Sequence, residues 1–320
     1  MMEKFRILSS NGTTQLHCEM YKPEGEPKAI LQIVHGMCEY IGRYKPFAEF
    51  LNKEGIMVVG DDHLGHGHSA NGDFGYFGET DGWKHLIEDE CILAKTVQEK
   101  YPGIPYILLG HSMGSFIARG VLATETANTF SGAIVMGTAG TNKAVDAGIA
   151  IANRLRKLHG SKGHSKLITA MAFGSYEKKI DHPINYYAWL SHDDQICIDH
   201  AQDPFCSFSF TIAGYEDMFR LLKYVNTKDW YDALPLNLPM LITCGWEDPV
   251  GNYGKGPAEV VEKMQEAGCE VAALFYEGMR HEVLNEIGKE TVYDDMLAFI
   301  LDCSEGLHIE KGLKTFCDFE

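Results

Sequence analysis

The pentapeptide G-H-S-M-G over residues 110–114 has Ser112 at its centre. A short apolar run at 106–109 comes before it, and apolar residues at helical spacing over 116–122 follow it. A serine between a strand and a helix in this G-x-S-x-G pattern is typical of a nucleophile elbow, a strained turn that presents the hydroxyl beyond the sheet edge. Such a hydroxyl can attack a carbonyl carbon. The alternative is a glycine-rich connection in which Ser112 only caps the helix.

A serine hydroxyl is inert until a base takes its proton and an acid orients that base. In this topology the acid and then the base follow the serine, each just beyond the end of a later strand. Asp248 follows one later apolar run and His281 follows the next, so we predict that Asp248 is the acid and His281 the base for Ser112. Glu247 competes with Asp248. We prefer Asp248 because it lies further past the strand end and Pro249 favours an extended backbone before it.

The attacked carbonyl develops a negative oxygen, which requires preorganised N–H donors that contribute roughly 3 kcal/mol each. The backbone N–H of Met113, the residue after the nucleophile, is one expected donor. The other should come from the loop after the third strand, where His35 and Gly36 precede Met37. We therefore predict an oxyanion hole formed by Met37 and Met113. This chemistry requires no cofactor, and we predict none.

Strand and helix patterns alternate around these residues. A hairpin is expected over 4–22, with its turn at Asn11 and Gly12. The other predicted strands cover 28–34, 56–59, 106–109, 132–136, 239–245 and 271–276, and the predicted helices cover 43–53, 81–100, 256–267 and 289–303. Such alternation predicts an α/β fold with a mostly parallel sheet and helices on both faces.

The alternation stops between residues 140 and 226, a stretch that is rich in aromatic residues. We interpret it as a helical cap inserted over the carboxyl ends of the strands, where open α/β sheets bind ligands. The alternative is a helical layer that serves only stability. The predicted organisation is a core at 1–139 and 227–320 and a cap at 140–226.

Composition narrows the class of partner and compartment. A formal charge of −17 disfavours nucleic acid, and no apolar run is long enough to span a membrane. The nine cysteines lack metal-ligand spacing and are expected to be free thiols, because several lie in apolar runs. Together with an N-terminus that lacks an apolar signal segment, this predicts a cytoplasmic protein.

Five ordered motifs resemble one family. They are H-G-x-x-E-x-x-x-R-Y over 35–44, D-H-x-G-H-G-x-S over 62–69, G-H-S-M-G over 110–114, D-P-V over 248–250 and H-E at 281–282. Together they resemble the monoacylglycerol lipase and lysophospholipase branch of the α/β-hydrolases, the serine aminopeptidase-like hydrolases. The resemblance implies an α/β-hydrolase fold with a cap and hydrolysis of an acyl ester through an acyl-enzyme.

By motif, the resemblance implies that Ser112, Asp248 and His281 form the triad and that Met37 and Met113 form the oxyanion hole. It also implies that Glu39 and Arg43 are the buried polar pair beside the site, near the position of a glycerol head group. It makes the acidic and histidine-rich turn a structural feature rather than a metal site, and no tetrahedral ligand spacing occurs in it. That turn contains Asp61, Asp62, His63, His66 and His68.

Alternative functions remain open at this stage. Within the enzymes these are a general carboxylesterase, a thioesterase and an aminopeptidase-like peptidase, whose free amine would need cap acids such as Asp193, Asp194, Asp199 or Asp203. A ligand-binding protein without activity is disfavoured because no triad member is missing. The basic residues between 154 and 179 leave open a transient contact of the cap with a membrane or lipid, although a solvated helix face explains them more simply. The oligomeric state is not determined by the sequence.

Overall fold

The computed structural model describes residues 1–306. Predictions for residues 307–320, including Cys317 and the end of the predicted core segment, lie outside the described residues. The strands are β1 Met2–Leu8, β2 Gln15–Tyr21, β3 Ala29–Val34, β4 Ile56–Asp61, β5 Tyr106–His111, β6 Gly132–Met136, β7 Met240–Gly245 and β8 Val271–Tyr276. The predicted hairpin and the six further predicted strands are confirmed.

The eight strands form one sheet in the order β1-β2-β4-β3-β5-β6-β7-β8. β1 and β2 pair antiparallel, as do β2 and β4, whereas the pairs from β4 through β3 to β8 are parallel. Parallel strands need crossover connections, and these connections carry the helices that cover both faces. The fold is that of the α/β-hydrolases.

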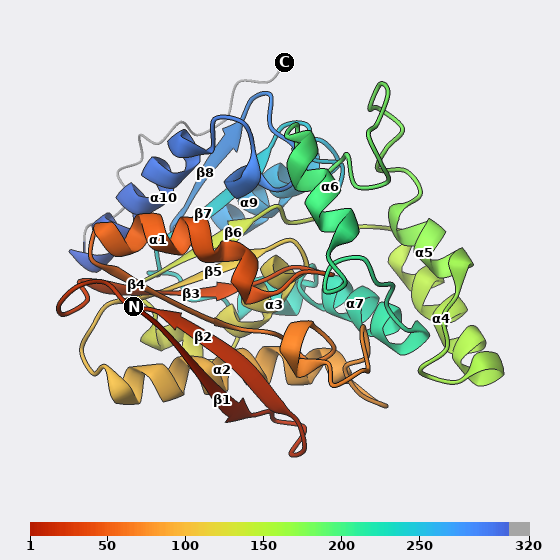
Figure 1. Cartoon of the computed structure of the whole chain (residues 1–320), viewed down its shortest axis with the longest axis horizontal. Coiled ribbons are helices and arrows are strands. Elements are labelled where there is room, and N and C mark those ends of the chain that lie inside the picture. The colour runs from red at the N-terminus through yellow and green to blue at the C-terminus, as the bar shows by residue number, and fades with distance from the viewer. Residues whose placement is uncertain (307–320) are drawn as a thin grey trace.

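Residues 1–306 contain ten α-helices (Figure 1). They are α1 Lys45–Lys53, α2 Gly82–Lys100, α3 Met113–Leu122, α4 Val145–His159, α5 Lys166–Phe173, α6 Asp194–Gln202, α7 Ile212–Tyr224, α8 Lys228–Asp232, α9 Lys255–Glu266 and α10 Lys289–Ser304. Short 3-10 helices occupy Ile41–Tyr44, Gly67–Ser69, Glu125–Thr129 and Val283–Asn285.

Two hydrophobic cores hold the layers together, one on each face of the sheet. One core packs α1 and α10 against the sheet through Phe47, Leu51 and Phe299, all nearly inaccessible to solvent. The other packs α2, α3 and α9 against the opposite face through residues such as Leu93 and Val121. Alternate residues of each buried strand point to opposite faces, so the apolar strand runs supply both cores.

The segment between β6 and β7 contains helices α4 to α8, and no strand of the described residues falls within it. Figure 1 shows α4, α5 and α6 projecting from one end of the sheet. α7 packs against α4 and also against α2 and α3 of the core. Because α7 contacts both parts, the division into a core and a cap at 140–226 stays a prediction.

Two further properties concern the whole described chain. Within residues 1–306, no helix is both long and apolar enough to cross a membrane. The eight cysteines of these residues are free thiols, most of them buried.

Candidate active site

Ser112 stands between the end of β5 and the first residue of α3. Its backbone is in a strained region for a residue with a side chain, at φ 55° and ψ −122°. The turn is this tight because two glycines permit it. A Cβ on Gly114 would lie 2.0 Å from the carbonyl oxygen of Val34, and one on Gly110 would lie 2.3 Å from that of Gly114. The strand–turn–helix context of a nucleophile elbow is therefore present.

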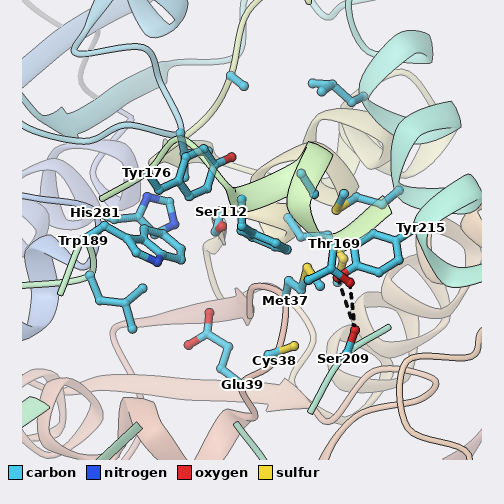
Figure 2. Close-up of a pocket in the computed structure, with 18 of the residues that line it drawn as sticks. Met37, Cys38, Glu39, Ser112, Thr169, Tyr176, Trp189, Ser209, Tyr215 and His281 are labelled. Carbon is cyan, nitrogen blue, oxygen red and sulfur yellow. Dashed lines mark hydrogen bonds between the residues drawn. The ribbon is translucent and has the colours of Figure 1, made fainter. Parts of the chain in front are cut away.

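Asp248 and His281 come together from the loops that follow β7 and β8. Asp248 Oδ2 lies 2.9 Å from His281 Nδ1, and both side chains are almost completely buried. The other carboxylate oxygen of Asp248 accepts the backbone N–H of Val250 at 2.8 Å. This arrangement directs the opposite ring nitrogen of His281, Nε2, away from the acid, and Nε2 is buried with no hydrogen-bond partner among the described residues. Figure 2 shows the imidazole beside Ser112.

Glu247, the competing acid, lies elsewhere. Its carboxylate is 3.1 Å from His192 Nε2 and about half exposed, at 51% of the side chain. The structure thus brings Asp248, and not Glu247, to the imidazole of His281.

Met37 and Met113 both line the cavity into which Ser112 opens. Met113 is the first residue of α3, so its N–H has no acceptor within the helix. The N–H of Gly36 is already bound by the carboxylate of Glu39, which fixes the loop that carries Met37. Both residues therefore border the cavity beside Ser112, and their role as an oxyanion hole stays a prediction.

Glu39 and Arg43 belong to a larger buried polar group. The guanidinium of Arg43 binds both oxygens of Glu282, at 2.7 and 2.8 Å, and one oxygen of Glu39 at 3.1 Å. The other oxygen of Glu39 accepts the hydroxyl of Tyr44 and lies 3.0 Å from His111 Nδ1. The predicted pair of Glu39 and Arg43 is therefore in contact. Tyr44, His111 and Glu282, which also belong to the five motifs, complete the group.

The charges in this group determine its protonation. Burial alone would raise the pKa of Glu39, but the His111 imidazole and the Arg43 guanidinium outweigh burial and lower that pKa. Burial alone would also raise the pKa of Glu282, but the Arg43 guanidinium outweighs burial and lowers that pKa. Burial together with the Arg43 charge lowers the pKa of His200, which lines the same cavity, to about 4. His200 is therefore neutral at pH 7.

A short segment between α5 and α6, residues 188–192, is attached by hydrogen bonds to the loop that carries His281. Arg280 donates hydrogen bonds to the carbonyls of Ala188 at 2.7 Å and Ser191 at 3.0 Å, and the N–H of Glu282 donates to the carbonyl of Leu190 at 2.7 Å. These bonds hold Trp189 against the imidazole, with ring centroids 5.1 Å apart. Trp189 is one of the aromatic residues of the stretch between 140 and 226, but its contact with His281 could not be predicted, because it depends on how this stretch folds back onto the His281 loop.

The cavity over Ser112 measures about 360 Å³. One part is bordered by Glu39, Glu282 and His200. Most of the remaining wall is apolar. Helices α4, α5 and α7 supply much of it, including Val145, Phe173, Met218, Phe219 and Leu222. The cavity therefore suits a ligand with both a polar and an apolar part.

The acidic and histidine-rich turn lies at the end of β4. Asp62 accepts the backbone N–H groups of Ile41 at 3.1 Å and His68 at 2.7 Å, as a turn-stabilising residue does. His63 Nδ1 lies 2.9 Å from Asp61 and 3.2 Å from Glu90, and all three are buried. Two triplets could hold a metal ion by their spacing: Asp61 with His63 and Glu90, and His17 with Asp62 and His68. Asp62 and His63, however, already make hydrogen bonds within the protein.

The sheet order and a strained serine at the end of β5 place this protein in the α/β-hydrolase class. Within that class, the chain belongs to the Hydrolase_4 family, described as serine aminopeptidase, S33, which matches residues 25–288.

Individual relatives agree with the family. A monoglyceride lipase homolog of monkeypox virus is 29% identical over 272 residues, covering 85% of this chain and 88% of that protein. A monoacylglycerol lipase of Mycolicibacterium smegmatis is 26% identical over 297 residues, covering 91% of this chain and 94% of that protein. A thermostable carboxyl esterase from Bacillus coagulans, solved in complex with glycerol, is 31% identical with a TM-score of 0.89, covering 95% of this chain and 99% of the esterase. These comparisons identify a carboxylic-ester hydrolase in the monoacylglycerol lipase-like branch.

Proposed function

We propose that the protein hydrolyses monoacylglycerols to a fatty acid and glycerol through an acyl-enzyme on Ser112. The observation that carries this proposal is the buried pair of Asp248 and His281, 2.9 Å apart, beside a serine in an elbow that opens on a largely apolar cavity. The monoacylglycerol lipases among its relatives support the choice of substrate.

In the first half of the reaction, His281 Nε2 takes the proton of the Ser112 hydroxyl as its oxygen attacks the ester carbonyl. Asp248 holds the imidazole through Nδ1–H and stabilises the imidazolium. The same proton then passes to the leaving glycerol oxygen, and the acyl group stays on Ser112. In the second half, His281 deprotonates a water molecule that releases the fatty acid and restores the serine.

The negative oxygen of each tetrahedral intermediate is held by the backbone N–H groups of Met37 and Met113. Each donor contributes roughly 3 kcal/mol because it is oriented before the charge develops. The bond between Gly36 and Glu39 keeps the first of these loops in place, so the buried polar group supports catalysis as well as the head-group region.

A neutral head group fits this cavity better than the phosphate of a lysophospholipid. Of the described residues that line it, none is a lysine or arginine, whereas Glu39 and Glu282 bring negative charge. Arg43, a cation beside the cavity, is engaged by those two carboxylates. A phosphate would meet uncompensated negative charge, so glycerol is the proposed leaving group.

The peptidase alternative is less well supported. It requires cap carboxylates to hold a free amine, and none of Asp193, Asp194, Asp199 and Asp203 lines the cavity. Asp193 instead caps α6, and Asp203 accepts the hydroxyl of Tyr40 at 2.9 Å.

For the cap, we propose residues 140–226 as the part that covers the cavity and makes transient contact with lipid. Its surface combines the basic residues between 154 and 179 with exposed apolar side chains. These are Leu158, Leu167, Met171, Ile184 and Tyr186. Such a surface suits an anionic lipid interface. Free thiols throughout residues 1–306 support a reducing, cytoplasmic location.

The test is steady-state hydrolysis of a matched panel: a monoacylglycerol, the corresponding lysophosphatidylcholine, a short p-nitrophenyl ester, an acyl thioester and an aminoacyl p-nitroanilide, each with wild type and S112A. We expect preference for the monoacylglycerol and its loss in S112A. Preference for the short ester alone would reduce the proposal to a general esterase, and activity of S112A would exclude Ser112 as the nucleophile.

A further inference from the structure

Three hydroxyl groups meet on the wall of the cavity over Ser112. They belong to Thr169 on α5, Tyr215 on α7 and Ser209 in the segment between α6 and α7. The hydroxyl of Tyr215 donates to Thr169 Oγ1 at 3.1 Å, and Ser209 Oγ lies 3.2 Å from Thr169 Oγ1 and 3.4 Å from the Tyr215 hydroxyl. Figure 2 shows this trio on the opposite side of Ser112 from His281 and Trp189. We refer to Thr169, Ser209 and Tyr215 as the hydroxyl trio.

The trio lies on the side where an acyl chain would pass. The neighbouring wall from α5 and α7 is apolar and includes Phe173, Met218 and Phe219. The charged side chains of the cavity, Glu39 and Glu282, belong to the region assigned to the glycerol head. A polar cluster within the acyl wall is not needed to bind an unsubstituted hydrocarbon chain, so its presence calls for an explanation.

The hydrogen bonds of the trio show which kind of group it can receive. Thr169 also donates to the carbonyl of Ser165 at 3.2 Å, and Ser209 donates to that of Phe210 at 3.4 Å. With Tyr215 donating to Thr169, each of the three hydroxyl protons has an acceptor within the protein. Each hydroxyl oxygen offers two lone pairs. Acceptor capacity is therefore left over, and a guest group that donates a hydrogen bond fits best.

The phenol of Tyr215 remains neutral in this position. Its side chain is 1% exposed, and burial raises its pKa to about 12. A neutral trio attracts a neutral donor and offers no charge to a carboxylate or an amine.

We propose that the hydroxyl trio is an acyl-chain subsite that accepts a hydroxyl group borne by the chain, so that the substrates include glycerol esters of hydroxy fatty acids. This inference rests on the proposed function and specifies its acyl group. The chain's hydroxyl donates to a free lone pair of the trio while its carbonyl is attacked by Ser112. The chemistry of ester cleavage is unchanged.

Unsubstituted chains remain substrates, because the trio satisfies its own hydrogen bonds when no guest group is present. A correctly placed chain hydroxyl gains about one net hydrogen bond, which corresponds to roughly a tenfold higher kcat/KM. A hydroxyl at any other carbon is buried against apolar side chains without a partner, and its ester is cleaved more slowly than the unsubstituted one.

The experiment compares decanoylglycerol with the series of its positional hydroxydecanoyl isomers, each offered to wild type, T169V, Y215F and S209A. We expect one isomer, or two adjacent isomers, to be cleaved about tenfold faster than decanoylglycerol by wild type. T169V and Y215F should reduce that ratio to about one. Tyr186 is a matched control, since it is another tyrosine of the cavity wall but lies outside the trio, and Y186F should leave the ratio unchanged.

Two results would overturn the inference: every hydroxy isomer being cleaved more slowly than decanoylglycerol, or a preference that persists in both T169V and Y215F. The isomer scan with wild type decides the first of these even if a variant fails to fold. Decanoylglycerol itself separates the two proposals. If wild type cleaves it and S112A does not, the proposed function stands whatever the isomers show.

Discussion

Replacing Arg43 by methionine removes the guanidinium that pairs with two buried carboxylates, Glu39 and Glu282. Its guanidinium binds Glu282 through two bonds and Glu39 through one, at 2.7 to 3.1 Å. The side chains of Glu39 and Glu282 are only 5% and 4% exposed, so water cannot replace the lost contacts. The methionine fills similar volume but leaves Glu282 without this guanidinium and leaves Glu39 to its contacts with Gly36, Tyr44 and His111.

Breaking a buried ion pair by removing one partner costs about 3–5 kcal/mol of unfolding free energy, far more than an exposed pair is worth. Lys45 and Glu49 provide the exposed control, at 3.6 Å with both side chains 59% exposed. We expect R43M to lose about 3–5 kcal/mol near pH 8 and K45M to lose less than about 1 kcal/mol.

The pH dependence has a definite sign. In the wild type the pKa values of Glu39 and Glu282 are lowered from their ordinary 4.5, so their contribution to stability is present above about pH 4.5 and is lost as the pH falls through the folded-state values. Without Arg43, we expect burial to raise the pKa of Glu282 most, because Arg43 is the main group that lowers it, whereas His111 still lowers the pKa of Glu39. The variant then takes up protons on folding, and its deficit should shrink from pH 8 to pH 5.

Urea unfolding followed by circular dichroism at pH 5 and pH 8 measures both effects. A deficit for R43M at pH 8 no larger than that of K45M would refute the reasoning, because the carboxylates would then be compensated by something other than Arg43. A deficit that grows as the pH falls would contradict the assigned protonation states.

Three further predictions concern individual side chains. D248N should lower kcat about 10⁴-fold, because the amide favours the wrong tautomer of the His281 imidazole, whereas E247Q should change kcat little. Steady-state kinetics measures both effects, and equal losses of kcat in the two variants would contradict the assignment of Asp248 as the acid. Burial raises the pKa of Asp217 to about 7 from 3.8, so the stability it contributes falls as the pH rises across that interval. The melting temperature of D217N should therefore rise relative to that of the wild type between pH 4 and pH 8. Curves of melting temperature against pH that run parallel for the two proteins would contradict this prediction. W189L should lower kcat about tenfold at nearly constant KM, and W189F should restore most of the lost kcat. If W189L lowers only the melting temperature, Trp189 does not position His281.

The elements that place Ser112, Asp248 and His281 could be predicted from the sequence because each signal is local. A buried strand gives a continuous apolar run, and the elbow requires small residues at two positions where a side chain would collide with backbone oxygens. Once the strands are expected to be parallel, their carboxyl ends must meet at one edge. The three loops therefore converge without further information.

The contacts that residues 140–226 make with the site could not be predicted, because they depend on packing between residues far apart in the sequence. Trp189 contacts His281 only because Arg280 and Glu282 bind the backbone around it. The hydroxyl trio joins Thr169 on one helix to two residues that lie 40 and 46 positions later in the chain, with no periodic signal. Glu282 belongs to the H-E motif, but the sequence does not show that it pairs with Arg43. The indication of this role is that Arg43, if buried, needs carboxylate partners, and Glu39 supplies one of them.

The central claim is that Ser112 is the nucleophile, and covalent labelling tests it most directly. The protein is treated with a fluorophosphonate, digested, and the modified peptide is located by mass spectrometry in wild type, S112A and the neighbouring control S115A. We predict one adduct per chain on Ser112 in wild type and S115A, and none in S112A. An adduct on another residue, or equal labelling of S112A, would contradict the account.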